Sequence, residues 1–142
     1  MPAVGEIQKW ARFALNAQNI ENAEFTLVIA TQDEMQALNH QYRKKNQVTN
    51  VLSFPFEAPL GLPDEAKTDK FLGDIIICPD RLAEEATAQQ KVLEHHWCHI
   101  LIHGILHLLG YDHNDDAEAN KMESLEISLL KQLNIANPYL EK

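Results

Sequence analysis

The segment at residues 91–109 constrains the fold of this chain more than any other. Stepped at about 100° per residue, it is apolar over most of its surface and carries four histidines on one narrow face: His96, His99, His103 and His107. A helix that is apolar nearly all round is buried at the centre of a domain. Because burying imidazoles without partners is costly, the histidine face must meet a cleft or another polar group.

Two of these histidines, with a third beyond the helix, have the spacing of a zinc site. His103 and His107 are four residues apart and so lie on one helical face. Gly110 can adopt a positive φ, end the helix and let His113 return as a third ligand. Three protein ligands leave one position of a tetrahedral zinc open, as a catalytic site requires. We predict one zinc ion here; nickel, copper or iron would also accept imidazole ligands. The alternative is separate polar residues, two of which face solvent.

The remaining histidines are assigned more modest roles. His99 lies one turn before His103, and it is either a partner of the metal ligands or a core histidine bonded to a backbone carbonyl. We expect His40, His95 and His96 to be solvated or capping residues.

Position 104 separates two chemistries. The spacing of the histidines and Gly110 matches the zinc signature of metzincin peptidases, H-E-x-x-H-x-x-G-x-x-H. In those enzymes the glutamate is the general base that activates water. Here Gly104 occupies that position. The metal geometry is therefore kept, whereas the peptidase base is missing.

A specific family resemblance follows from several blocks. The run H-G-I-L-H-L-L-G-Y-D-H at residues 103–113 resembles the signature of the YbeY family of bacterial metal-dependent endoribonucleases. Further blocks resemble that family in the same order: Y-R-K-K-N at 42–46, T-N-V-L-S-F-P-F at 49–56, G-D-I-I-I at 73–77 and N-P-Y-L at 137–140. Family members usually begin with an additional N-terminal strand, whereas this chain enters a helix almost at once. Either this member has lost an edge strand or the sequence begins after it, so the completeness of the sheet stays open.

The resemblance implies an activity and a setting. It implies a zinc-dependent endoribonuclease for single-stranded RNA, acting in 16S rRNA 3′-end maturation and ribosome quality control with ribosome-associated proteins. Arg43 occupies the family's arginine position, and a guanidinium can clamp a phosphate and stabilise its developing charge. The attacking group, either water or a ribose 2′-hydroxyl, stays open.

The net charge opposes generic attraction to RNA. The chain carries a formal charge of −9, and its one basic cluster is Arg43-Lys44-Lys45. For the two lysines, a solvated helix end is the better interpretation. We therefore expect weak binding of naked RNA, with specificity supplied by the ribosome or a partner protein, and we expect no DNA substrate.

Length and composition predict a globular protein, and the order of its expected helices and strands predicts the α+β class. The 142 residues are expected to form one domain, 1–142, with ordinary core content at 45% hydrophobic residues. No apolar run approaches the ~20 residues of a membrane span, and no signal peptide is evident at the start. Cys78 and Cys98 lie in apolar segments and are predicted to be buried free thiols in a reducing cytoplasm.

The periodicity of the chain places its elements. We predict helices at residues 6–17, 33–43, 80–88, 91–109 and 115–133, with Thr31 as N-cap of the second and Asn114 or Asp115 as cap of the last. Strands are predicted at 24–30, 51–54 and 73–78. The family resemblance implies a small mixed sheet with the zinc helix packed across it and a zincin-like metal geometry.

Three functional hypotheses remain at this stage. The first is the zinc-dependent endoribonuclease. The second is a metallohydrolase of another substrate class, such as a peptidase with a base from elsewhere in the fold. The third is a ribosome-associated module without catalysis, in which zinc is structural.

Overall fold

The computed structural model describes residues 1–21, 23–43, 49–56, 71–112 and 115–139, except for the side chain of Arg43. Within these residues the protein has an α+β fold with a small mixed sheet, in the order α1 (Val4–Ala17), β1 (Glu24–Ile29), α2 (Gln32–Arg43), β2 (Val51–Pro55), β3 (Phe71–Ile77), α3 (Pro79–Gln89), α4 (Leu93–Leu108) and α5 (Asp116–Gln132). The predicted fold class is confirmed. The zincin-like metal geometry stays a prediction, because His113 lies outside the described residues.

The sheet has the strand order β1-β3-β2. β1 runs parallel to β3, which pairs Leu27 with Ile75, and β2 runs antiparallel to β3, which pairs Ser53 with Ile75. The central strand is buried over most of its length, and its isoleucines at 75 and 77 have no exposed surface. Such a continuous apolar run is expected of a strand covered on both faces.

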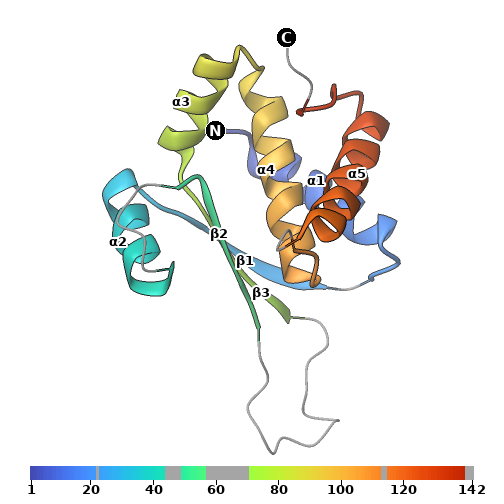
Figure 1. Ribbon diagram of the computed structural model, residues 1–142, viewed down its shortest axis with the longest axis horizontal. Coiled ribbons are helices and arrows are strands. Elements are labelled where there is room, and N and C mark those ends of the chain that lie inside the picture. Colours follow the sequence, from blue (N-terminus) through green and yellow to red (C-terminus); the bar gives the residue numbers. More distant parts are fainter. Residues whose placement is uncertain (22, 44–48, 57–70, 113–114, 140–142) are drawn as a thin grey trace, which may run out of the picture.

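Helices cover both faces of this sheet (Figure 1). On one face α4 packs against β2 and β3 and also contacts α1, α3 and α5. The larger core lies here, and it includes Trp97, Leu101 and Ile105 of α4. On the other face α2 packs through Met35 in a smaller core with Leu52. The helix with the histidines is therefore the central element of the main core, as its sequence predicted.

Local signals in the sequence explain where the helices begin and end. The Thr31 hydroxyl accepts a hydrogen bond from the Glu34 backbone N–H, and the Glu34 carboxylate accepts one from the Thr31 N–H, which is a capping box at the start of α2. Asp115 caps α5 by accepting from the Glu118 N–H at 2.7 Å. Gln90 adopts φ 55°, which ends α3 and separates it from α4.

The prediction for the two cysteines is confirmed. Cys78 and Cys98 are buried free thiols. Among the described residues, none of the helices is both long and apolar enough to cross a lipid bilayer.

Candidate functional site

Two of the predicted metal ligands converge on one point. Helix α4 places His103 and His107 on successive turns, and their Nε2 atoms are 3.0 Å apart. Their rings meet edge to face with centroids 4.6 Å apart. Both residues are half-buried. The geometry confirms that the two histidines share one face of α4 and direct the same ring nitrogen toward each other.

A buried carboxylate holds the other nitrogen of His103. Glu126 of α5 has no exposed surface, and its Oε1 lies 2.5 Å from His103 Nδ1. Burial raises the pKa of Glu126, but the hydrogen bonds with His103 and Tyr139, together with the nearby His99, outweigh it and lower the pKa to about 2. Glu126 is therefore an ionised carboxylate that only accepts hydrogen bonds. It follows that His103 Nδ1 carries a proton, and that in a neutral ring Nε2 keeps its lone pair.

Tyr139 and His99 complete the environment of this carboxylate. The Tyr139 hydroxyl donates a short hydrogen bond to Glu126 Oε2. Its oxygen lies 3.2 Å from His99 Nε2 and accepts a hydrogen bond from that nitrogen. Burial lowers the pKa of His99, and burial together with the bond to Glu126 raises the pKa of Tyr139. At neutral pH both groups are therefore uncharged beside one buried negative charge.

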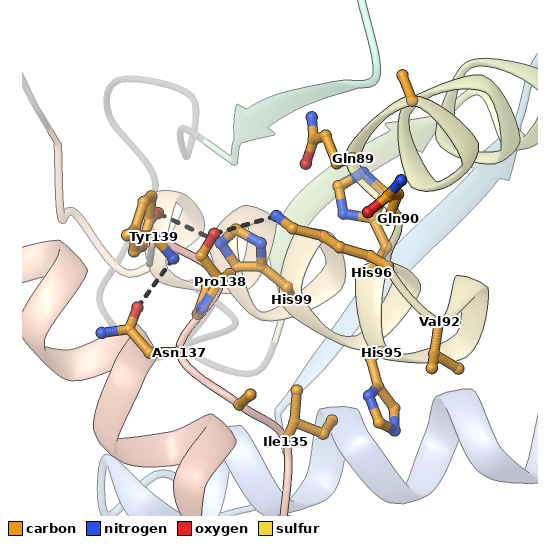
Figure 2. A pocket seen from close by; sticks show the side chains of 13 residues that line it. Gln89, Gln90, Val92, His95, His96, His99, Ile135, Asn137, Pro138 and Tyr139 are labelled. Atoms are coloured by element: carbon orange, nitrogen blue, oxygen red, sulfur yellow. Dashed lines mark hydrogen bonds between the residues drawn. The ribbon is translucent and has the colours of Figure 1, made fainter. Parts of the chain in front are cut away.

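A pocket of about 570 Å³ lies beside this network, between the start of α4 and the C-terminal segment at residues 135–139 (Figure 2). His99 and Tyr139 belong to its wall. The segment is fastened by Lys91 Nζ, which donates to the Pro138 carbonyl at 3.1 Å, and within the segment the Asn137 side chain accepts from the Tyr139 N–H at 2.8 Å. The C-terminal segment thus brings Tyr139 back across α4.

The interpretation of His96 as a solvated or capping residue is wrong. His96 is 5% exposed, and its Nε2 lies 2.9 Å from Glu85 Oε1 of α3. The reason is that α3 packs against α4 and covers this end of the histidine face. His99 is not bonded to a backbone carbonyl in any described contact; its side-chain partners are Tyr139 and, at 3.6 Å, Glu126. His40 and His95 are exposed, as expected.

Gly104 faces the sheet rather than the histidine pair. A Cβ at this position would lie 3.2 Å from one Ile75 methyl group, 3.3 Å from the other and 3.3 Å from Ser53 Oγ. The Ser53 hydroxyl also donates to the Gly104 carbonyl at 3.2 Å. The position that carries the base in metzincin peptidases is therefore closed by packing.

The structure brings together only part of the predicted site. Gly110 has the expected positive φ, 101°, just after α4. His113 lies outside the described residues, and so does the side chain of Arg43, the last residue of α2. Within the described part of the chain, no three His, Cys, Asp or Glu residues come together to form a metal site. The roles of His113 and Arg43 stay predictions.

Sequence reasoning missed Glu126, although a signal was present. Helix α5 buries Met122, Leu129 and Leu130, and Glu126 lies on the same stripe, four residues after Met122. A lone carboxylate within an apolar stripe indicates a buried polar partner, because an unpaired buried charge is very costly. The histidine face of α4 was the obvious candidate for that partner.

Known proteins resemble this chain over its whole length. The family model described as Endoribonuclease YbeY matches residues 3–134. An Endoribonuclease YbeY of Francisella tularensis subsp. tularensis is 52% identical over all 142 residues and 84% of its own length, and one of subsp. novicida is 51% identical, with 87% of its length covered. The solution structure of TM1509 from Thermotoga maritima superposes with a TM-score of 0.56 at 25% identity, over 94% of this chain and 88% of that one. The chain belongs to the YbeY family of endoribonucleases.

Proposed function

We propose that this protein is a zinc-dependent endoribonuclease that cleaves single-stranded RNA and acts in 16S rRNA 3′-end maturation and ribosome quality control. Family membership supports the ribonuclease activity. The observation that carries the metal dependence is the convergence of His103 and His107 through Nε2, while Glu126 holds the opposite nitrogen of His103.

The described residues fit a zinc ion. Two ligands at about 2.0–2.1 Å from a tetrahedral ion are roughly 3.3 Å apart, and the two Nε2 atoms here are separated by 3.0 Å. A histidine that binds metal almost always donates its other ring N–H to a carboxylate, carbonyl or water, as His103 does to Glu126. His113 is the proposed third ligand.

The reaction divides between the metal site and the arginine. When bound, zinc would supply Lewis acidity, which would activate the attacking water or ribose 2′-hydroxyl and offset the negative charge that develops on phosphate. His103, His107 and His113 would hold that ion. Arg43 binds the phosphate through its guanidinium and stabilises its charge in the transition state.

The proposed substrate is RNA presented by a partner. With a formal charge of −9, the chain does not attract phosphate over its whole surface, so contacts near Arg43 must be local. Ribosome-associated proteins in the cytoplasm would then supply specificity. DNA and membranes are not expected partners.

The test uses purified protein, one equivalent of zinc, single-stranded RNA and a casein substrate in parallel. We expect RNA cleavage that disappears on chelation and returns with zinc, and that is lost in His107→Ala and in Arg43→Ala. The matched controls are His95→Ala, an exposed histidine of the same helix, and Arg12→Ala, an exposed arginine of α1; both should cleave like the wild type. Preparing all variants in parallel identifies a contaminating ribonuclease, which would cleave equally in every sample.

Other outcomes select the other hypotheses. Casein cleavage that survives in Arg43→Ala would replace the ribonuclease proposal with a peptidase. A protein that is inert toward both substrates and melts on chelation would indicate structural zinc, since a structural ion contributes directly to folding.

A further inference from the structure

We propose that Glu126 and Tyr139 are positioning residues: together they hold His103 in the one tautomer and orientation that can bind the metal. This inference rests on the proposed metal site, but its first test needs neither metal nor RNA.

The first step concerns protons. Glu126 is fully buried in the core and lies 2.5 Å from His103 Nδ1, so the ring must direct an N–H at it. An imidazole that donates from Nδ1 presents the Nε2 lone pair on its other side. The position of His107 agrees, because His107 Nε2 lies 3.0 Å from His103 Nε2 and can donate a hydrogen bond to it when no metal is bound. Glu126 therefore selects the nitrogen that faces His107.

The second step concerns the carboxylate itself. A carboxylate on a flexible side chain orients a ring only if its own rotation is prevented. Tyr139 donates to the Oε2 atom of Glu126, while His103 is bonded to the Oε1 atom. The two oxygens thus have separate donors from α4 and from the C-terminal segment, and the carboxylate plane is fixed between them.

The third step concerns the C-terminal segment. Tyr139 lies beyond the residues that the family model matches, 3–134, and it is 43% exposed. Its hydroxyl nevertheless reaches the buried carboxylate, because the bond from Lys91 to Pro138 fastens the segment across α4 (Figure 2). His99 adds a hydrogen bond to the Tyr139 hydroxyl oxygen. The segment therefore acts on the metal site through Glu126 without contacting a ligand itself in any described contact.

A purely structural role makes a different prediction. If the other surroundings of His103 set its tautomer and Glu126 only satisfied a buried imidazole, the loss of Glu126 would lower the stability of the fold but would leave the tautomer unchanged in the surviving folded protein. The tautomer is measured by ¹⁵N NMR of the histidine rings in metal-free protein at pH 8. We expect His103 protonated at Nδ1 in the wild type and largely at Nε2 in Glu126→Leu. An unchanged Nδ1 tautomer in folded Glu126→Leu would overturn the proposal.

Metal affinity gives the second readout and does not depend on activity. Loss of a partner behind a metal ligand typically weakens binding by roughly 10–100-fold. In competition with a chromophoric chelator, we expect a zinc Kd raised about tenfold or more in Glu126→Gln, which keeps the shape of the side chain. In Tyr139→Phe we expect a smaller rise, since the direct bond to His103 remains. A Kd within twofold of the wild type in Glu126→Gln would contradict the proposal.

Two control variants test whether the effects depend on the positions of Glu126 and Tyr139. Each removes a similar group, a carboxylate or a tyrosine hydroxyl, from another position. Glu123→Gln removes a carboxylate from the same helix, one that also acts electrostatically on Tyr139. Tyr111→Phe removes a hydroxyl that donates to Gln18 at 2.9 Å, away from Glu126. Both should leave the zinc Kd within about twofold of the wild type. Failure of the proposed function would appear elsewhere, as wild-type protein that binds no zinc or cleaves no RNA, while the tautomer result would stand on its own.

Discussion

Gly104 offers a quantitative test of how α4 is packed against the sheet. An alanine there would place its Cβ 3.2–3.3 Å from both Ile75 methyl groups and Ser53 Oγ. Neither neighbour can yield easily, because Ile75 is fully buried in the central strand and Ser53 is bonded to the Gly104 carbonyl. Overpacking of this kind costs about 1–3 kcal/mol, whereas Gly→Ala inside a helix contributes about 1 kcal/mol. We therefore expect Gly104→Ala to lower the free energy of unfolding by about 1 kcal/mol, with Tm roughly 4 °C lower.

The assay is urea denaturation followed by circular dichroism, with an unchanged m-value as evidence that compactness is unaltered. Gly5→Ala is the matched control, because Gly5 lies in α1 and nothing lies within 4 Å of a Cβ there. That variant should gain up to about 0.5 kcal/mol. Ile75→Val removes one of the crowding methyl groups, so Gly104→Ala should cost less in its background, as a double-mutant cycle measures. A Gly104→Ala protein as stable as Gly5→Ala would refute the packing account.

The same packing bears on the peptidase alternative. Gly104→Glu would restore the letters of the metzincin signature, yet its side chain would be directed at Ile75 and Ser53 rather than at the histidine pair. Burying that carboxylate without a partner is more costly than adding a methyl group. We expect a variant that is less stable than Gly104→Ala and has no activity on casein; casein cleavage dependent on this glutamate would show that the residue does reach the metal.

The remaining predictions concern other parts of the structure. Cys98 has no exposed surface, and its burial, with the nearby charge of Glu6, raises its pKa to about 12. A thiol reagent at pH 8 should therefore label Cys98 only in denatured protein, and prompt labelling of the native protein would contradict this. Burial raises the pKa of Glu85, but hydrogen bonds with His96 and Asn50 outweigh it and hold the pKa below 4.5. Glu85 therefore stabilises the fold above about pH 4.5, and this stabilisation is lost as the pH falls through the lowered pKa of Glu85 in the folded protein. By urea denaturation, the stability difference between wild type and Glu85→Gln should be larger at pH 7 than at pH 3. A constant difference would exclude this linkage. Thr31→Ala removes the cap of α2 and should cost about 1 kcal/mol in the same assay, whereas no change would mean that the cap is solvated in the native protein.

Much of the fold follows from local patterns in the sequence. The period of about 3.6 residues placed the central helix to within two residues at its start, 91 against Leu93, and its end to within one. Thr31 and Asp115 marked helix starts because their side chains can accept from backbone N–H groups that a helix leaves unpaired. These signals are local, so they can be recognised in the sequence without knowledge of the tertiary packing.

The partners of the histidines did not follow from the pattern of α4 itself, because they are set by tertiary packing. Glu85 and Glu126 are 11 and 23 residues away from the rings that they bond, on two different helices. No periodicity within α4 could indicate which neighbour would supply a carboxylate. His96 was misassigned for the same reason, since the sequence showed its position near a helix start but not the helix that covers it.

Each histidine on the buried face of α4 needs a hydrogen-bond partner, and each has a different one. His96 is paired with Glu85 of α3, His99 with Tyr139 of the C-terminal segment, and His103 with Glu126 of α5. Each of these partners occupies one ring nitrogen, and the remaining nitrogens distinguish the roles. The Nδ1 atoms of His96 and His99 are buried without a partner in the described structure, while His103 directs Nε2 toward a half-buried neighbour, His107. A metal ion needs a nitrogen with a second ligand within reach, and among these three histidines the described contacts give that arrangement to His103. The metal site is therefore expected at the C-terminal half of α4, and the N-terminal half serves to hold the helix in its core.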